Sequence, residues 1–237
     1  MRPQYPKARP LVFLYRKPTP LFDRLAAEVA AARLPLFPYP VEVEDPWKAL
    51  PCLAPLGLAG AVLGEAWPSA EGVRLEPEAR AAGLVDLVVP GAGGPVGQYT
   101  EGVALERFLS LSFPGARGLW LGPLRPSLAP FLRPLGQVSV AAGSFAEGDG
   151  FLARLPERAR GHVALRREEV ASLALKADLL LYAGGGFPLD ILQPFHALLA
   201  LAPVDRGVWE RVHAVYPPEE LLAFQARVAL EGLGYPL

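Results

Sequence analysis

The stretch Glu78-Ala-Arg-Ala-Ala-Gly-Leu-Val-Asp-Leu-Val-Val89, followed by Pro95-Val-Gly-Gln-Tyr-Thr-Glu-Gly102, is the part of the sequence on which the fold assignment rests. Residues 84–89 and 95–99 have the apolar, extended character of strands, and the glycines at 91–94 are typical of a tight turn. We therefore expect a hairpin. These glycines should serve the turn and not a phosphate-binding loop, because an extended segment follows them and not a helix. A helix is predicted over residues 101–111.

Toward the N-terminus, apolar runs alternate with segments of helical spacing. Thr19 followed by Pro20 is typical of a helix start, with a hydroxyl as N-cap and proline at the first helical position. The predicted elements are a strand at residues 11–15, a helix at 20–33, a proline-broken edge strand at 37–41, a short helix from Asp45-Pro46 onward, and a strand at 58–63.

Toward the C-terminus, strands and helices alternate regularly. Strands are predicted at residues 118–121, 137–141, 162–165, 178–182 and 196–202, and helices at 127–135, 167–176 and 189–193. An amphipathic helix at 218–233, capped by Gly234, follows them. Strands that alternate with helices imply βαβ units and a parallel sheet. The fold class is therefore α/β.

The composition excludes several classes of protein. The 237 residues carry a net charge of -1 and one cysteine, Cys52, so nothing favours a nucleic-acid partner or a membrane, and neither an intrachain disulfide nor a multi-cysteine metal site is possible. No uninterrupted apolar run reaches membrane-spanning length. Residues 1–7 lack the apolar stretch of a secretory signal, so we expect a short, poorly ordered leader and a cytoplasmic protein. The 27 prolines and the absence of asparagine suit a thermophile.

Several segments resemble the shikimate dehydrogenase family. Residues 78–89 resemble the family's Ala-rich helix running into Gly-Ala-Val-Asn-Thr-Val, and residues 97–102 resemble its Gly-x-Asn-Thr-Asp-Gly. Weaker similarities follow the same order along the chain, at Arg16-Lys-Pro-Thr-Pro20, Arg206-Gly-Val-Trp209 and Leu222-Ala-Phe-Gln-Ala226.

The resemblance implies two lobes around a cleft. Residues 1–101, completed by the C-terminal helix at 217–237, would form the substrate domain, and residues 102–216 a Rossmann-like domain. It also implies NADP-dependent reduction of 3-dehydroshikimate.

The catalytic residues of the family are only partly present. The family uses a lysine close to an aspartate, but no lysine occurs between Lys48 and Lys176, and Glu65 lies nearest to the expected place. Glu101 stands in place of the aspartate and is the one catalytic candidate. Its extra methylene would displace the carboxylate, and a shift of about 1 Å can cost roughly a hundredfold in rate.

The substrate-binding residues implied by the resemblance are largely substituted. Asp86 and Tyr99 replace two asparagines, and Lys17 and Thr19 replace two serines that bind the shikimate carboxylate. Gln225 matches the family directly. These substitutions favour a retained pocket whose ligand has changed.

The cofactor loop also departs from the family. Gly122 ends the right kind of strand, but Pro123-Leu-Arg-Pro126 follows instead of Gly-x-Gly-x-x-Gly. Prolines remove backbone donors and fill the space that phosphates need. Gly122 and Arg125 are the remaining cofactor-binding candidates, and Arg125 could bind one phosphate through its side chain. Residues 142–144 lack the charged residue that reads the adenosine ribose. The sequence therefore argues against normal NADP binding. The glycines at 184–186 form either a flexible connection or a ligand loop.

Two functions stay open. The chain is either a divergent family member that is inactive or very weak and binds a small polar ligand, or an active NAD(P)-dependent oxidoreductase with substituted residues. Either would be a monomer or a homodimer. No metal site is predicted, because His162, His196 and His213 lack partners at ligand spacing and should be surface or partly buried side chains. Cys52 and Trp209 are expected to serve in packing.

Overall fold

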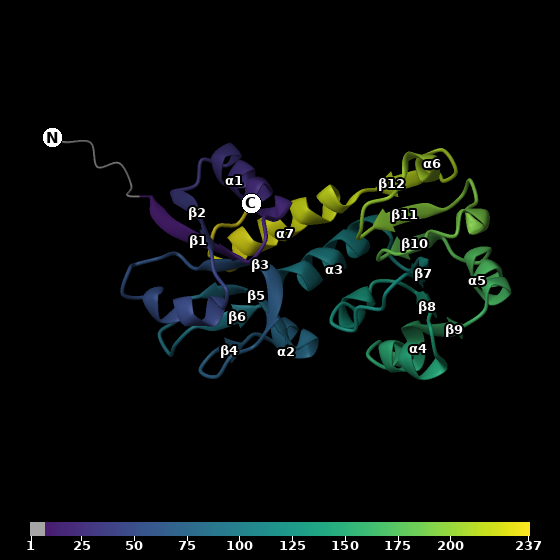
Figure 1. Cartoon of the computed structure of the whole chain (residues 1–237), viewed down its shortest axis with the longest axis horizontal. Coiled ribbons are helices and arrows are strands. Elements are labelled where there is room, and N and C mark those ends of the chain that lie inside the picture. Colours follow the sequence, from purple (N-terminus) through teal and green to yellow (C-terminus); the bar gives the residue numbers. More distant parts are fainter. Residues whose placement is uncertain (1–7) are drawn as a thin grey trace. The chain divides into compact units, whose positions relative to one another are not determined.

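The computed structural model describes residues 8–237, so the leader predicted at residues 1–7 lies outside the described residues. The described chain forms two compact units. The first contains the described residues up to Ala104 together with Leu222–Leu237, and the second contains Leu105–Leu221. Each unit is built on its own six-stranded sheet (Figure 1).

The sheet of the first unit is mixed, with the strand order β2-β1-β3-β5-β6-β4. Its first three strands are parallel, whereas β5 runs antiparallel to both β3 and β6. The strands are β1 (Arg9–Tyr15), β2 (Leu36–Glu42), β3 (Ala61–Pro68), β4 (Arg74–Leu75), β5 (Leu84–Val89) and β6 (Val96–Gln98).

The helices of this unit start where the sequence predicts. Thr19 caps α1 (Pro20–Ala31), because its Oγ1 accepts the N–H of Leu21. Asp45 caps a 3-10 helix at Pro46–Cys52 in the same way. The remaining helices are α2 (Pro77–Ala82), α3 (Thr100–Ser112), which continues into the second unit, and α7 (Pro218–Gly232), which begins there.

The core of the first unit joins segments from both ends of the described chain. Leu11 and Phe13 of β1 pack with Leu25 of α1 and with Ala226 and Leu230 of α7 in one buried cluster. Figure 1 shows α7 (yellow) beside α1 in this unit. The cluster buries apolar surface that neither helix could bury alone, which is the main force holding α7 in place.

Two sequence predictions in this unit are confirmed. Residues 84–89 and 96–98 form a hairpin, and Gly91 and Gly94 exchange two backbone hydrogen bonds in its turn. The proline-containing strand β2 lies at the edge of the sheet. Pro38 and Pro40 lack an N–H, so an edge position costs them no ladder hydrogen bond.

The sheet of the second unit is parallel throughout, with the order β12-β11-β10-β7-β8-β9. This is the doubly wound arrangement of a Rossmann-like domain and confirms the α/β class. Its elements are β7 (Arg117–Leu121), β8 (Gln137–Ala141), α4 (Phe145–Leu152), β9 (Arg160–Ala164), α5 (Arg167–Ala174), β10 (Leu179–Tyr182), β11 (Ala197–Ala200), α6 (Arg206–Trp209) and β12 (Ala214–Tyr216), with 3-10 helices at Ala129–Leu132, Glu157–Ala159 and Leu189–Ile191.

Some predicted helices are wrong. The helix expected at residues 127–135 is a single 3-10 turn, Ala129–Leu132, because Pro130 and Pro134 each remove a backbone donor. The helix expected at 189–193 is likewise a short 3-10 turn. Conversely, α4 was not predicted, since Gly148 and Gly150 weaken its helical signal.

Three packing predictions are also wrong. Cys52 is exposed and not a core residue. Trp209 is 47% exposed, and its neighbour Val208 is the residue that packs in the core. His196 is fully buried, where its ring bonds the N–H of Gln193 and the carbonyl of Ala174. Its imidazole ties α5 to the start of β11.

None of the helices within residues 8–237 has both the length and the apolar character needed to cross a lipid bilayer.

Candidate functional site

The centre of the candidate site is the carboxylate of Asp86 on β5. Asp86 is 1% exposed. Its Oδ1 accepts the backbone N–H of Thr100 at 2.6 Å, and its Oδ2 accepts that of Glu101 at 2.8 Å. These are two of the first N–H groups of α3, which have no acceptor within their own helix. Asp86 therefore caps α3 from a neighbouring strand.

Burial changes the acidity of this group. The pKa of Asp86 is raised from its ordinary 3.8 to about 7, chiefly by removal from water and in smaller part by the nearby charge of Glu101. The two backbone N–H bonds oppose this rise because they stabilise the anion. The result is a carboxyl group able to gain or lose a proton near neutral pH, which is the property of a general acid or base.

A second helix contributes to the same centre. Gln225 of α7 is buried, and its Nε2 donates to Asp86 Oδ2 at 3.2 Å and lies 3.5 Å from Thr100 Oγ1. One carboxylate thus joins β5, α3 and α7. Close by, the Tyr99 hydroxyl donates to Glu101 Oε2 at 3.0 Å, with the Tyr99 ring fully buried and Glu101 partly exposed.

The irregular part of β3 lies opposite Asp86. In the pairing of β3 with β5, Val62 faces Leu87 and Trp67 faces Val85, so four residues of β3 stand against Asp86 alone. Glu65 lies within this bulge. Bulges of this kind re-aim side chains and occur frequently beside active sites.

Glu65 is held by an arginine from the end of β1. Arg16 Nε lies 2.7 Å from Glu65 Oε1, and the Arg16 guanidinium lies over the Trp67 ring, 4.2 Å from its centroid. Both members of the ion pair are about half exposed, so the pair contributes little to stability. Its effect is to fix the positions of two charges, one just after β1 and the other within the bulge of β3.

Lys17 and Thr19 lie in the segment that follows the carboxyl end of β1. Lys17 is exposed and makes no hydrogen bond or ion pair within residues 8–237. Thr19 is partly buried, and a Cβ at Gly64 would lie only 3.0 Å from its methyl group. Gly64 thus lets the bulge of β3 approach the start of α1.

The second unit presents a tight turn after its central strand β7. Gly122 has φ +91°, and a Cβ there would collide with the carbonyl oxygen of Gly184 at the end of β10. The Trp120 indole donates to the Pro123 carbonyl at 3.1 Å. The chain then enters the four-residue 3-10 helix at Ala129–Leu132. No α-helix therefore starts at this turn.

The arrangement matches known structures, although no family model and no curated protein matches the sequence. The shikimate 5-dehydrogenase from Listeria monocytogenes, solved with shikimate and NAD, has a TM-score of 0.75 and 14% identity over 94% of this chain and 91% of that chain. The quinate dehydrogenase from Corynebacterium glutamicum, solved with NAD, has a TM-score of 0.76 and 16% identity over 95% and 93%. The 5-ketofructose reductase of Gluconobacter sp. strain CHM43, free of ligand, has a TM-score of 0.75 and 14% identity over 97% and 94%. The chain has the shikimate dehydrogenase fold. At such low identity the match establishes the fold alone.

The dinucleotide that the shikimate dehydrogenase fold implies does not fit the turn after β7. A pyrophosphate is bound by backbone N–H groups at a helix N-terminus, and here Pro123 and Pro126 lack an N–H while only a 3-10 turn follows. Arg125 is partly buried and already engaged within the chain. After β8, Ser144 uses its hydroxyl to cap α4 by accepting the N–H of Glu147.

Most of the residues that the resemblance singled out lie in the first unit. The structure joins Asp86, Tyr99, Glu101 and Gln225 through hydrogen bonds, whereas Lys17 and Thr19 lie at the ends of β1 and α1. Their roles in binding or catalysis stay predictions. Among residues 8–237, no group of three or more His, Cys, Asp or Glu side chains could hold a metal ion.

Two participants were missed by the sequence interpretation. Thr100 donates its backbone N–H to Asp86, and its Oγ1 lies 3.5 Å from the Gln225 amide nitrogen. Trp67 lies beneath the Arg16 guanidinium. Thr100 could have been found, since it stands unchanged in the motif that resembles Gly-x-Asn-Thr-Asp-Gly. Trp67 gave no signal, because its partner is distant in sequence.

Proposed function

We propose that the chain is a divergent shikimate dehydrogenase-like protein that binds a small polar ligand in its first unit. It would be inactive, or very weak, in the NADP-dependent reduction of 3-dehydroshikimate. The turn at Gly122–Pro126 carries this proposal. Strand β7 runs into prolines and a 3-10 helix where the cofactor's pyrophosphate would need the N-terminus of an α-helix.

The proton-transfer groups support the same proposal. Reduction of a ketone requires a proton for the carbonyl oxygen as well as a hydride from the cofactor. The bulge of β3 holds Glu65, and its partner Arg16 carries a guanidinium, a group that is a poor proton donor. Asp86 titrates near neutrality, but both of its oxygens are occupied by the amides of α3.

The ligand class follows from the groups that remain available. The Lys17 ammonium is exposed and unpaired among the described residues, and it lies between Thr19 and Arg16, the partner of Glu65, in the segment that follows β1. These groups suit a carboxylate or hydroxyl group on a small molecule. The proteins of similar fold are named for shikimate, quinate and 5-ketofructose, all small hydroxylated molecules. A small hydroxylated acid is therefore the proposed ligand for this chain.

Thermal unfolding with shikimate, quinate, NAD and NADP tests the proposal, since a ligand that binds only the folded state raises its Tm. We expect a hydroxylated acid to raise Tm and neither nucleotide to do so, with no formation of reduced nicotinamide from shikimate or quinate. The Lys17→Ala variant should lose the stabilisation by acid. Turnover with either nucleotide would overturn the proposal.

A second function has one observation in its favour. Asp86 is a buried carboxyl with a pKa of about 7 beside Glu101, a pattern found among catalytic acids and bases. If an active NAD(P)-dependent oxidoreductase used it, Asp86→Asn would abolish turnover while leaving nucleotide binding intact. A cytoplasmic location and a monomeric or homodimeric state stay predictions.

A further inference from the structure

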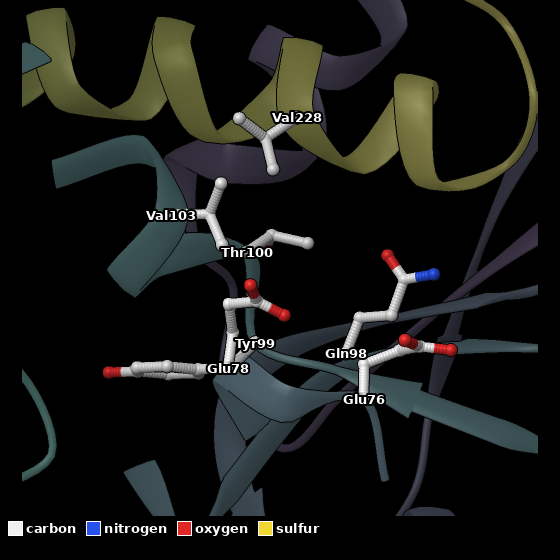
Figure 2. Close-up of a pocket in the computed structure, with 7 residues that line it drawn as sticks. All are labelled: Glu76, Glu78, Gln98, Tyr99, Thr100, Val103 and Val228. Atoms are coloured by element: carbon white, nitrogen blue, oxygen red, sulfur yellow. The ribbon is translucent and has the colours of Figure 1, made fainter. Parts of the chain in front are cut away.

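A separate cavity lies in the first unit, at the start of α2. It measures about 180 Å³ and is lined by residues from α2, β6, α3 and α7: Glu76, Glu78, Gln98, Tyr99, Thr100, Val103 and Val228. Figure 2 shows Glu78 and Gln98 extending toward the space beneath Val228, with Val103 at its side. The cavity is about six times the ~30 Å³ that one water occupies in the liquid, so it has room for a small organic molecule.

The polar side chains of this cavity lack partners in the chain. Glu76, Glu78 and Gln98 are all partly buried, and their side chains make no hydrogen bond or ion pair among residues 8–237. Arg80, the nearest cation along α2, donates its guanidinium to the Leu75 carbonyl instead. Partly buried carboxylates without a counter-charge lose part of their hydration and have no ion pair to offset that loss.

Helix α7 leaves room for the side-chain amide of Gln98. A Cβ at Gly232 would collide with Oε1 of Gln98 and would lie 2.7 Å from a methyl group of Leu87. A glycine within a helix costs about 1 kcal/mol relative to alanine. The last residue of α7 thus admits the Gln98 side chain at the cavity. The helix dipole favours glutamates at a helix start, which explains why Glu76 and Glu78 occur at the start of α2. It does not explain why they line a cavity together with Gln98.

We propose that this cavity binds a small organic cation, an aliphatic diamine or an alkylguanidinium. The two carboxylates would pair with the cationic group, and the Gln98 carbonyl oxygen would accept a further N–H. Val103 and Val228 would contact the methylene chain, because their side chains form the apolar wall of the cavity. That wall disfavours Mg²⁺ or Ca²⁺, which require six or more oxygen ligands.

The site is independent of the proposed function. It shares Tyr99 and Thr100 with the Asp86 centre, but its unpartnered side chains, Glu76, Glu78 and Gln98, do not belong to that centre. Failure of shikimate or quinate to bind would therefore leave it untouched, and its own failure would not affect the hydroxylated-acid proposal.

Isothermal titration with agmatine and putrescine tests the proposal, with succinate as an anion of similar length. We expect measurable binding of at least one cation and none of succinate. Removing one charge with Glu78→Gln should weaken binding about tenfold or more, as expected for a charge-assisted pair, and the double variant Glu76→Gln/Glu78→Gln should abolish it. Unchanged Tm values would show that the variants fold.

Glu71→Gln is the matched control, because Glu71 is an exposed glutamate of the same unit that does not line the cavity. It should leave binding unchanged. The proposal is overturned if neither cation binds the wild-type protein, if Glu71→Gln weakens binding as much as Glu78→Gln, or if Mg²⁺ or Ca²⁺ competes with agmatine for the cavity.

Discussion

The amide of Gln225 donates a hydrogen bond to the carboxylate of Asp86 across 3.2 Å, which joins two residues 139 positions apart in the sequence. This bond ties the C-terminal helix α7 to the strand that caps α3. A buried acceptor that loses its donor keeps the full cost of desolvation, so the stability of the first unit should depend on this contact.

Gln225→Ala should lower the free energy of unfolding by about 2 kcal/mol, since it removes a hydrogen bond to a buried charged group. Chemical denaturation at pH 8, where Asp86 is ionised, measures the effect. Arg227→Ala is the control on the same helix. Arg227 is exposed and pairs with Glu28 at 3.3 Å, which should be worth less than about 1 kcal/mol. Equal effects of the two variants would contradict the role given to Gln225.

The raised pKa of Asp86 predicts how stability varies with pH. The folded protein holds a proton up to about pH 7, whereas the unfolded chain releases it near 3.8. Between these values the folded state binds more protons, so stability falls as pH rises, by up to about 1.4 kcal/mol per pH unit. Asp86→Asn should flatten this slope between pH 5 and 7, as measured by denaturation across that range. An unchanged slope would contradict the assignment to Asp86.

Carboxylates with lowered pKa values act in a different window. Asp178 and Asp190 bond to Arg117 and Arg167, which lowers their pKa values below the ordinary 3.8. Their stabilisation is present above that value and is lost only as the pH falls further. Acid denaturation below about pH 4 should therefore respond to Asp178→Asn, whereas the slope near neutrality should not.

Thr19→Ala should destabilise α1 by about 1 kcal/mol, because it leaves the N–H of Leu21 without its side-chain acceptor. Thr19→Ser keeps the hydroxyl and should restore most of the loss. The difference in unfolding free energy between the two variants isolates the cap from the ligand role proposed for this residue. A Thr19→Ser variant as unstable as Thr19→Ala would show that the methyl group beside Gly64 matters more.

Gly122→Ala should destabilise the second unit by at least about 1–3 kcal/mol, since the new Cβ meets the Gly184 carbonyl and the backbone has φ +91°. Gly186→Ala is the matched control from the facing loop, because its Cβ would meet open space at a φ that other residues adopt. Urea unfolding compares the two. A tolerated Gly122→Ala would mean that the turn after β7 is looser than described.

The sequence predicted those elements whose signals are local. The hairpin follows from its glycine turn, and the start of α1 follows from Thr19 and Pro20. Helix α4 was not predicted because it contains Gly148, a poor helix former. Tertiary packing requires this glycine, since a Cβ there would lie 2.5 Å from the Val163 side chain. Such a contact is invisible before the fold is known.

The candidate site divides in the same way. The motif around residues 97–102 predicted which residues would gather at the start of α3. Two other contacts depend on strand register and on the bulge in β3. These are the capping of α3 by Asp86 and the ion pair between Arg16 and Glu65. Spacing along the chain carries no information about either. The sequence could also not locate the cavity beside Glu78, which requires α7 to pack against α3.

The position of α7 in the core of the first unit has a consequence for synthesis on the ribosome. Ala226 and Leu230 pack against β1 and α1, which leave the exit tunnel some two hundred residues earlier. The parallel sheet of the second unit is complete by Tyr216. The core of the first unit therefore stays incomplete until α7 has been made, whereas the sheet of the second unit needs no residue beyond Tyr216.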